Sequence, residues 1–447
     1  MMTIEQFGRR LRARELTAVR VTDQCLRRIE ADNPKLNAFI TVMADEAMRQ
    51  AREADQELAA GNDRGPLHGV PISIKDLLDI HGVPTTAASR VREGHVAERD
   101  ATTIAHLRMA GAVFVGKTNL HEFAFGTTSE DSAFGPVRHP HDPTRSPGGS
   151  SGGSAVSVAA GMALATIGTD TGGSIRIPAA ACGLVGLKPS VGEVSSDGVV
   201  PLSRTLDHIG PLAQSVSDAS LLYHALMGDA HAQPPAPMPL HGLRLALPRK
   251  YFCDLLDDEV RARFEEALDR LQSAGAHINE IEFHHAAEIA TIYLHLVLAD
   301  AAAYHAVTLE TMPERYTAPV RIRLEMGRYV LAEDYVRALA GRERLRREVD
   351  AALSKHDALI LPSLPIPAPP IGATSVQVGT TSEPVRNLML RLTQLFNVTG
   401  NPAIAMPAGH TKAGLACSVQ LVGRRMQTDQ LLRVALACES AVTGPRS

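Results

Sequence analysis

The chain has 447 residues, of which 45% are hydrophobic and 21% charged, a composition typical of a globular protein with a sizeable core. Its 45 basic and 49 acidic residues leave a net charge of -4, which excludes the strongly basic surface of nucleic-acid or anionic-membrane binding. The five cysteines form no C-x-x-C pair, so we expect reduced, mostly buried thiols and neither a disulfide framework nor a zinc site.

The first part of the chain alternates between helices and strands. Helical spacing of apolar residues from 19 to 29 ends at Asn33-Pro34, and residues 45–58 predict a second helix. Residues 70–74 alternate between apolar and other residues, which predicts a strand with Lys75 at its end. A helix over 101–110 then leads into a short buried strand over 112–115.

The second part begins with a strand near 184–187 and a proline-rich surface linker over 229–242. Residues 243–248 predict a strand, and a mainly helical region follows to about 355, including helices over 258–273 and 334–353. Residues 357–372 return to a strand with a proline-rich exit. The simplest architecture is one α/β domain with a central mixed sheet and a helical excursion.

Several short motifs suggest functions that their context does not support. Residues 111–118, GAVFVGKT, fit the Walker A pattern, but the four middle residues read as a strand where a phosphate-binding loop should be, so nucleotide binding is a remote alternative. His121-Glu122 lacks the second zinc ligand of H-E-x-x-H because position 125 is Phe. The histidine pairs 139/141 and 284/285 are expected to be hydrogen-bonded or surface residues.

The glycine-rich stretch GGSSGGS at 148–154 fits G-x-S-x-G, the nucleophile elbow of α/β-hydrolases, with Ser150 as the nucleophile. An elbow requires an apolar strand that leads directly into the serine. The residues before Ser150, VRHPHDPTRSPGG, contain three prolines and cannot form a central strand. Ser150 is therefore not expected to be an elbow nucleophile.

A second glycine-rich stretch, GTDTGGS at 168–174, offers a better nucleophile. The backbone N–H groups of Thr171 to Ser174 can converge on one point as an oxyanion hole, which makes Ser174 the candidate nucleophile. Lys75 could act as its base if it were neutral, with Ser150 as a proton relay between them. From the residues alone an alternative stays open, in which the glycines only permit tight loops over a sheet.

Ordered motifs along the chain resemble the amidase signature family. They are GPLHGVPISIKD (65–76), GKTNLHEFAFG (116–126), SPGGSSGGSAVSVAAG (146–161), GTDTGGSIRIPAAACGLVGLKPS (168–190) and LDHIGPLAQSV (206–216). Weaker similarity extends over nearly the whole chain. The resemblance implies one domain over 1–447, with a central mixed β-sheet covered by helices on both faces. Its signature core would be 65–216, and 243–355 would be a mainly helical excursion that shapes the substrate pocket.

The resemblance also implies a catalytic triad of Lys75, Ser150 and Ser174, with a cis peptide bond between Gly149 and Ser150. Ser174 would form an acyl-enzyme, and Thr171, Gly172, Gly173 and Ser174 would form the oxyanion hole. Ser151 and Ser154 are expected to support the loop and the next helix. No metal or cofactor is implied.

The same resemblance leads to substrate residues and substrate classes. Tentative substrate-binding residues are Phe125, Gly126, Thr127, Arg176 and Ile177. Arg176 would bind a substrate carboxylate, or alternatively form a structural ion pair with Asp170 or Asp207. The pocket walls are expected within 284–340. This segment holds Tyr304, Met326, Tyr329 and Tyr335, which could equally be core residues.

We expect a stand-alone serine hydrolase acting on C–N bonds of small amides, anilides or carbamates, with ester cleavage as a side activity. The glutamine-dependent amidotransferase A-type subunit for tRNA-linked amidation is the alternative, but it typically carries Gln where this chain has Ile177. The apolar Ile177 favours small uncharged aryl or alkyl amides.

The expected partner is a small amide or carbamate substrate. If the protein forms an oligomer, we expect a homodimer. We expect no nucleic-acid partner, no membrane attachment and a cytoplasmic location. The N-terminal sequence is too charged for a secretory signal, and the apolar run 155–168 is too short to cross a bilayer.

Overall fold

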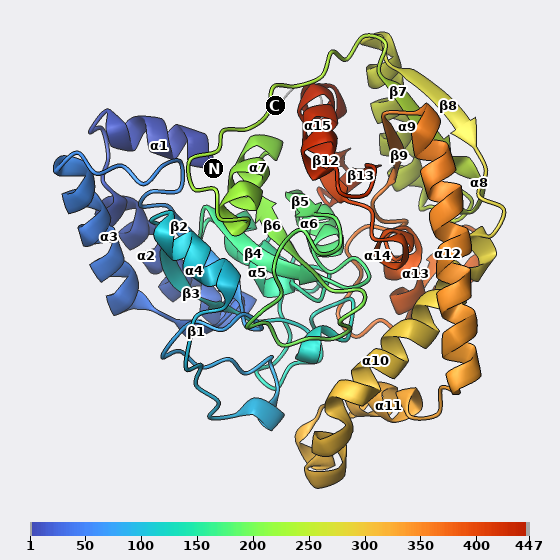
Figure 1. Cartoon of the computed structure of the whole chain (residues 1–447), viewed down its shortest axis with the longest axis horizontal. Coiled ribbons are helices and arrows are strands. Elements are labelled where there is room, and N and C mark those ends of the chain that lie inside the picture. Colours follow the sequence, from blue (N-terminus) through green and yellow to red (C-terminus); the bar gives the residue numbers. More distant parts are fainter. Residues whose placement is uncertain (1, 444–447) are drawn as a thin grey trace.

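The computed structural model describes residues 2–443, and its centre is one sheet of eleven strands (Figure 1). In spatial order the strands are β1 (Phe39–Val42), β3 (Val113–Thr118), β2 (Pro71–Lys75), β4 (Ala165–Asp170), β6 (His208–Ala213), β5 (Val185–Lys188), β12 (Ala403–His410), β13 (Ala416–Val422), β9 (Ala358–Pro362), β7 (Arg244–Pro248) and β8 (His277–Ile281). A separate hairpin pairs β10 (Ser375–Val378) with β11 (Thr381–Pro384). The predicted α/β class with a central mixed sheet is confirmed.

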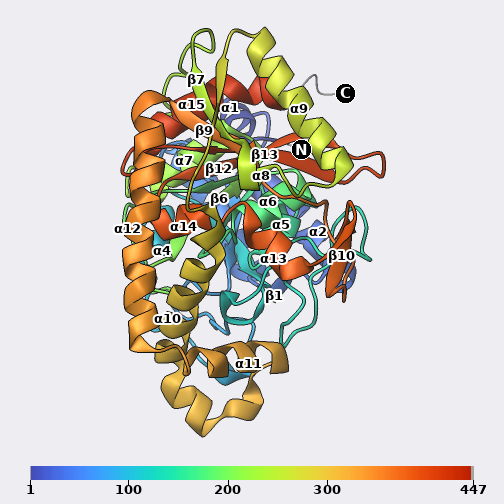
Figure 2. The same cartoon turned by 90° about the vertical axis from the view of Figure 1, so that its right-hand side faces the viewer.

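Helices flank this sheet on both faces (Figures 1 and 2). They are α1 (Ile4–Arg12), α2 (Ala18–Leu36), α3 (Ala44–Ala59), α4 (Thr102–Met109), α5 (Gly152–Ala159), α6 (Arg176–Cys182), α7 (Val216–Leu226), α8 (Arg249–Phe252), α9 (Asp258–Ser273), α10 (Ile289–Thr311), α11 (Ala318–Gly327), α12 (Ala332–Lys355), α13 (Val385–Arg391), α14 (Leu395–Thr399) and α15 (Thr428–Thr443). The five cysteines are buried and unpaired, as predicted.

The pairing of β2 with β4 positions the glycine-rich loops. β2 runs parallel to both β3 and β4, and Ile74 of β2 lies opposite Ile167 of β4. Because parallel strands end at the same edge of a sheet, Lys75 and the residues after Ile167 meet there. The sheet edge therefore brings Lys75 next to the loop that carries Ser174.

An alternating pattern usually means that one face of a strand is exposed to solvent, but β2 has no exposed face. All five residues of β2 are buried. Ser73 Oγ makes hydrogen bonds of 2.7 Å with Ser157 Oγ on α5 and 2.8 Å with Thr166 Oγ1 on β4. The polar positions of this central strand are thus satisfied by internal partners.

One helix boundary and one strand differ from the sequence prediction. α2 continues through Pro34 to Leu36, because Pro34 lies in the last turn and the helix ends where Asn37 adopts a left-handed conformation with φ 53°. The predicted helical excursion also contains β8, which pairs with β7 at the edge of the sheet. Such an edge strand is paired on one side only, and the residues of β8 are partly exposed, so its apolar pattern is weak.

α10 to α12 form a helical arm, in which α12 runs along one side of the domain and α11 lies at the bottom of Figures 1 and 2. Within it, Ala286–Thr311 has a mean hydropathy of 1.4 and the length of a membrane span, although half of that window is buried inside the protein. The apolar run 155–168, singled out from the sequence, is a different segment. α10 packs on α11 and α12, as core helices of globular proteins do.

The segment that fits the Walker A pattern forms a strand, as its apolar residues indicated. β3 covers Val113 to Thr118, so the GKT tripeptide lies in the sheet and no loop separates it from the strand. Lys117 is fully buried, with Nζ 3.0 Å from Asp76 Oδ1 and 3.0 Å from Thr85 Oγ1. Its ammonium group is therefore engaged inside the protein, and nucleotide binding through this motif is not supported.

Candidate active site

Lys75 is fully buried at the end of β2 and surrounded by hydroxyl groups. Its Nζ lies 2.8 Å from each of three hydroxyl oxygens, those of Ser150, Ser151 and Thr169. Burial lowers the pKa of Lys75 to about 7, although Asp170 and Asp207 act in the opposite direction. A large fraction of the Lys75 side chain is therefore neutral near pH 7 and available as a base.

Ser150 lies in a tightly packed loop after a cis peptide bond with Gly149, the bond that the resemblance implies. Its carbonyl oxygen accepts hydrogen bonds from the His121 N–H and the Ser129 hydroxyl, both at 3.1 Å. A Cβ atom on Gly149 would lie 2.7 Å from the backbone nitrogens of Thr128 and Ser129. Only glycine fits at position 149, so the loop conformation that directs Ser150 toward Lys75 depends on it.

Ser151 and Ser154 connect this loop to the rest of the site. The Ser151 N–H donates to the Ser174 carbonyl at 3.3 Å, and its hydroxyl contacts the Thr169 carbonyl at 3.2 Å. Ser154 Oγ lies 2.8 Å from Thr118 Oγ1 on β3. Both serines support the loop and α5. The direct contacts of Ser151 and Thr169 with Lys75 were not predicted.

The backbone from Thr171 to Ser174 forms the loop between β4 and α6. Gly173 has φ +140°, and a Cβ on Gly172 would collide with the Tyr293 hydroxyl and lie 2.9 Å from Leu390 Cδ2. The Thr393 hydroxyl donates to the Gly172 carbonyl at 2.6 Å. α10, α13 and the residues after α13 therefore hold the loop in place, although they lie more than a hundred residues away in sequence.

Ser174 is buried, with 6% of its surface exposed. Within residues 2–443 its hydroxyl has no hydrogen-bond partner, and the contact between the Ser150 and Ser174 hydroxyls is not made. Among the described residues the Ser174 oxygen is thus not engaged by a hydrogen bond.

Asp207 stabilises the same loop through Thr171. One carboxylate oxygen accepts from the Thr171 hydroxyl at 2.5 Å, and the other accepts from the backbone N–H groups of Leu202 and Ser203. Burial raises the pKa of Asp207 to about 6, against the effect of these hydrogen bonds and of Lys75. Asp207 was expected only as a partner for Arg176, which it does not contact.

Arg176 forms a buried ion pair with Asp170. Its Nε and Nη2 donate to the two Asp170 oxygens at 3.0 and 2.9 Å. The remaining donors contact the following acceptors at 2.6–3.0 Å: Thr393 O, Gln420 Oε1 and Asn397 Oδ1. Burial tends to raise the pKa of Asp170, but the Arg176 guanidinium outweighs it and holds that pKa well below its usual range. All donors of Arg176 are engaged, so the structure favours the ion pair over the substrate-binding role.

Replacement of Arg176 by methionine is expected to destabilise the protein by about 3–5 kcal/mol, because it leaves the Asp170 carboxylate buried without its partner. The midpoint of urea unfolding would measure the loss. Arg337→Gln is the matched control, since Arg337 is exposed and its loss should change stability by less than about 0.5 kcal/mol. Unchanged stability in Arg176→Met, with weaker binding of anionic substrates alone, would restore the substrate-binding role.

The other tentative substrate residues are all buried. Phe125 and Thr127 are buried, and the Phe125 ring faces the guanidinium groups of Arg323 and Arg386, each 5.9 Å from its centre. Gly126 leaves no room for a side chain because the His121 ring occupies that space. Ile177 is fully buried and packs beneath Gly148 and Gly173, so its role here is to support both glycine loops.

A cavity of about 350 Å³ lies between α10 and α13, beside the Gly172 loop. Tyr293 and Leu390, which touch the Gly172 position, line this cavity together with Arg386. Tyr293 was not predicted, and of the residues expected in the core or the pocket walls, three are exposed: Tyr304, Met326 and Tyr329. Tyr335 is partly buried and donates to Asp300.

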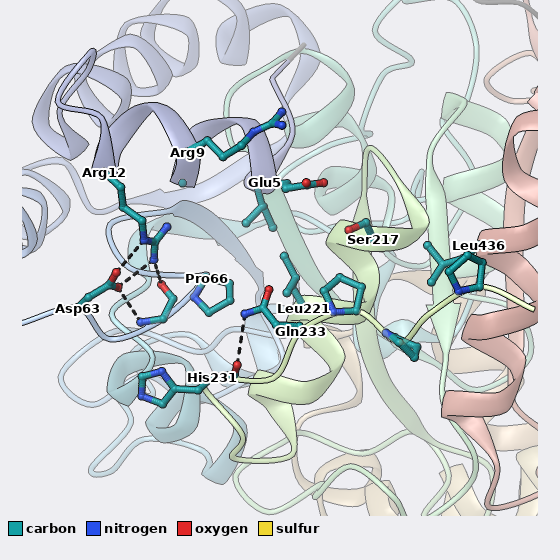
Figure 3. Close-up of a pocket in the computed structure, with 16 residues that line it drawn as sticks. Glu5, Arg9, Arg12, Asp63, Pro66, Ser217, Leu221, His231, Gln233 and Leu436 are labelled. Carbon is teal, nitrogen blue, oxygen red and sulfur yellow. Dashed lines mark hydrogen bonds and ion pairs between the residues drawn. The ribbon is translucent and has the colours of Figure 1, made fainter.

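A larger groove of about 800 Å³ lies elsewhere, between α1 and the 229–242 segment (Figure 3). The Arg12–Asp63 ion pair closes one end of this groove, and His231 and Gln233 border it. None of the predicted site residues line it. Size alone therefore does not identify the active site.

The histidines make local contacts. His139 Nε2 lies 3.0 Å from the Ala181 carbonyl, and His285 Nδ1 lies 2.6 Å from Glu348. His121 faces Asp131 at 3.1 Å. In the part of the chain from 2 to 443, no three His, Cys, Asp or Glu side chains are placed to hold a metal ion.

Comparison with known proteins identifies the family of the chain. The family model described as Amidase matches residues 20–432. An amidase from Pseudomonas putida is 41% identical over 99% of this chain and 96% of its own length. The A-type subunit of a glutamyl-tRNA(Gln) amidotransferase from Carboxydothermus hydrogenoformans is 38% identical over 98% and 96%. A crystal structure of an amidase superposes with a TM-score of 0.93 and 37% identity, covering 98% of this chain and 99% of that one. The chain belongs to the amidase family.

Proposed function

We propose that the protein is a serine amidase that cleaves C–N bonds of small amides, anilides or carbamates through Lys75, Ser150 and Ser174. The observation that carries the proposal is the buried Lys75, which contacts Ser150 and has its pKa lowered to about 7. A neutral lysine is the base that a serine nucleophile needs at neutral pH. The amidases among its relatives support the same reaction class.

In the proposed mechanism, neutral Lys75 takes the Ser150 hydroxyl proton while Ser150 takes the proton of Ser174. The Ser174 oxygen forms a bond to the substrate carbonyl carbon, and the carbonyl electron pair moves to its oxygen. The N–H groups of the Thr171–Ser174 loop stabilise this oxyanion. The proton returns through Ser150 to the leaving nitrogen as the C–N bond breaks, and water then hydrolyses the acyl-enzyme by the same route.

The surroundings of the loop give the substrate a defined place. α10, part of the predicted excursion 243–355, contributes Tyr293 at the Gly172 loop, and α13 contributes Leu390. We propose that the adjoining cavity of about 350 Å³ receives the part of the substrate next to the scissile carbonyl, a volume suited to a small molecule.

A second candidate is the glutamine-hydrolysing component of a tRNA-linked amidotransferase, which the 38% identity to such a protein favours. That activity requires a polar site for the glutamine amino-acid group. This chain carries Ile177 at the position where that component typically carries Gln, and the apolar Leu390 contacts the Gly172 position. We therefore rank the stand-alone amidase first.

The purified chain alone is expected to hydrolyse an anilide, a primary amide and a nitrophenyl carbamate and to show negligible glutaminase activity, because the ammonium group of glutamine would face the apolar Leu390 side chain at the Gly172 loop. Release of aniline, ammonia and nitrophenol in one panel measures this. Heat-inactivated enzyme controls for spontaneous carbamate decay. Cleavage of glutamine alone, and only after partner proteins are added, would favour the second candidate.

A further inference from the structure

Arg386 is a half-buried cation without a counter-ion. It lies in the first turn of α13, and in the part of the chain from 2 to 443 its guanidinium makes no ion pair and no hydrogen bond. The guanidinium does lie near the Phe125 ring, 5.9 Å from its centre. Removing a charge from water without giving it a partner is costly, and such charges are otherwise paired within the protein. Arg386 therefore has five N–H donors available for a partner that the folded chain does not supply.

The neighbouring charged groups are already engaged or do not reach it. Arg323 donates to the Phe125 carbonyl and lies 3.6 Å from Asp131. Arg391 stacks on the Tyr251 ring at 3.9 Å and donates to the Tyr251 carbonyl at 2.8 Å. Glu383 borders the same cavity but forms no ion pair with Arg386. The cavity thus carries an excess positive charge at Arg386.

The cavity that Arg386 lines reaches two side chains that contact the Gly172 position. Arg386, Tyr293 and Leu390 all line this cavity of about 350 Å³, and Tyr293 and Leu390 also touch the Gly172 position. A molecule with its carbonyl at the Ser174 loop could extend along Leu390 to the guanidinium. Burial lowers the pKa of Arg386, with Tyr293 as the one opposing group, so no carboxylate nearby offsets the desolvation.

We propose that Arg386 binds a carboxylate of the substrate, and that the preferred substrates are small amides with a carboxylate at the end away from the scissile bond. The inference rests on the proposed amidase function and names its substrate class. It replaces the expectation of uncharged substrates, which assumed that Ile177 lines the pocket. A guanidinium holds a carboxylate through two parallel N–H donors, which accounts for discrimination of about 10- to 100-fold.

The test compares two amides of matched length, glutaramate with its terminal carboxylate and the uncharged pentanamide. The wild-type enzyme is expected to favour glutaramate by at least about 10-fold in kcat/KM, mainly through a lower KM. Arg386→Gln should remove about 10- to 100-fold of kcat/KM for glutaramate and leave the value for pentanamide within about 3-fold. Arg386→Lys, which keeps the charge but loses the two-donor geometry, should restore part of the preference.

Arg391→Gln is the matched control, because Arg391 lines the same cavity but its guanidinium is held by Tyr251; it should keep the glutaramate preference. Calorimetric binding of glutarate gives a readout without turnover and should weaken at least about 10-fold in Arg386→Gln. Thermal unfolding of each variant checks that it is folded.

Equal loss for both amides in Arg386→Gln, or an equal effect of Arg391→Gln, would overturn the assignment. So would a wild-type enzyme that hydrolyses both amides equally and does not bind glutarate. If the wild type hydrolysed no amide but bound glutarate through Arg386, the proposed function would fail and the anion site would stand.

Discussion

Ser174→Ala is expected to abolish amide hydrolysis, because it removes the oxygen that forms the acyl-enzyme. Among residues 2–443 the Ser174 hydroxyl makes no competing hydrogen bond, whereas the Ser150 and Ser151 hydroxyls are engaged by Lys75. Losses of a nucleophile in comparable nucleophile-base units reach about 10⁶-fold in kcat. Steady-state hydrolysis of the anilide, with mass spectrometry after a fluorophosphonate probe, measures the effect and the labelled residue.

The matched control is Ser150→Ala, which removes the relay but keeps the nucleophile. Its activity should fall less than that of Ser174→Ala, because water can partly replace a relay hydroxyl. The probe is expected on Ser174 in the wild type and to be absent from Ser174→Ala. Labelling of Ser150 with Ser174 left free would contradict the assignment and restore the elbow interpretation.

Lys75→Met is expected to lower kcat/KM by several orders of magnitude, because it removes the base of the relay. In the wild type, kcat/KM should rise with pH through one ionisation near 7 and then stay high. The sign follows from the mechanism, since protonated Lys75 cannot accept a proton and its pKa is about 7. A pH profile from 5 to 10 measures it. A bell-shaped profile whose acid limb disappears in a single histidine variant would contradict the role of Lys75.

Stability provides the control for folding of Lys75→Met. The pKa of Lys75 is lowered on folding from 10.5 to about 7, so the unfolded chain binds a proton more tightly between these values and the native state loses stability as the pH falls through that window. Removing the lysine removes this pH dependence but also the Lys75 contacts of the Ser150, Ser151 and Thr169 hydroxyls, so the unfolding temperature of Lys75→Met should vary less with pH between 7 and 10 than that of the wild type. Unfolding of the variant at a much lower temperature would mean that its inactivity reflects misfolding.

The sequence by itself determined the class of fold and most elements, and it supplied the candidates for the reacting groups. Alternating and helical patterns depend on neighbours within a few positions, so they located β2 with Lys75 at its end and α3, α4, α9 and α12 within a few residues. The glycines of 148–153 and 172–173 marked close backbone approaches, because no other residue fits them. Edge strand β8 was missed because half-exposed strands carry little pattern.

Only the tertiary structure decided which residues the charged side chains of the site contact. Arg176 pairs with Asp170, and its remaining donors are held by Thr393, Asn397 and Gln420. These acceptors lie more than 200 positions away in the chain. Thr169 contacts Lys75 only because β2 and β4 pair in one particular register. Whether a guanidinium is satisfied, as in Arg176, or left open to a cavity, as in Arg386, depends on which side chains the packed helices bring within hydrogen-bond distance, and no local pattern encodes that distance.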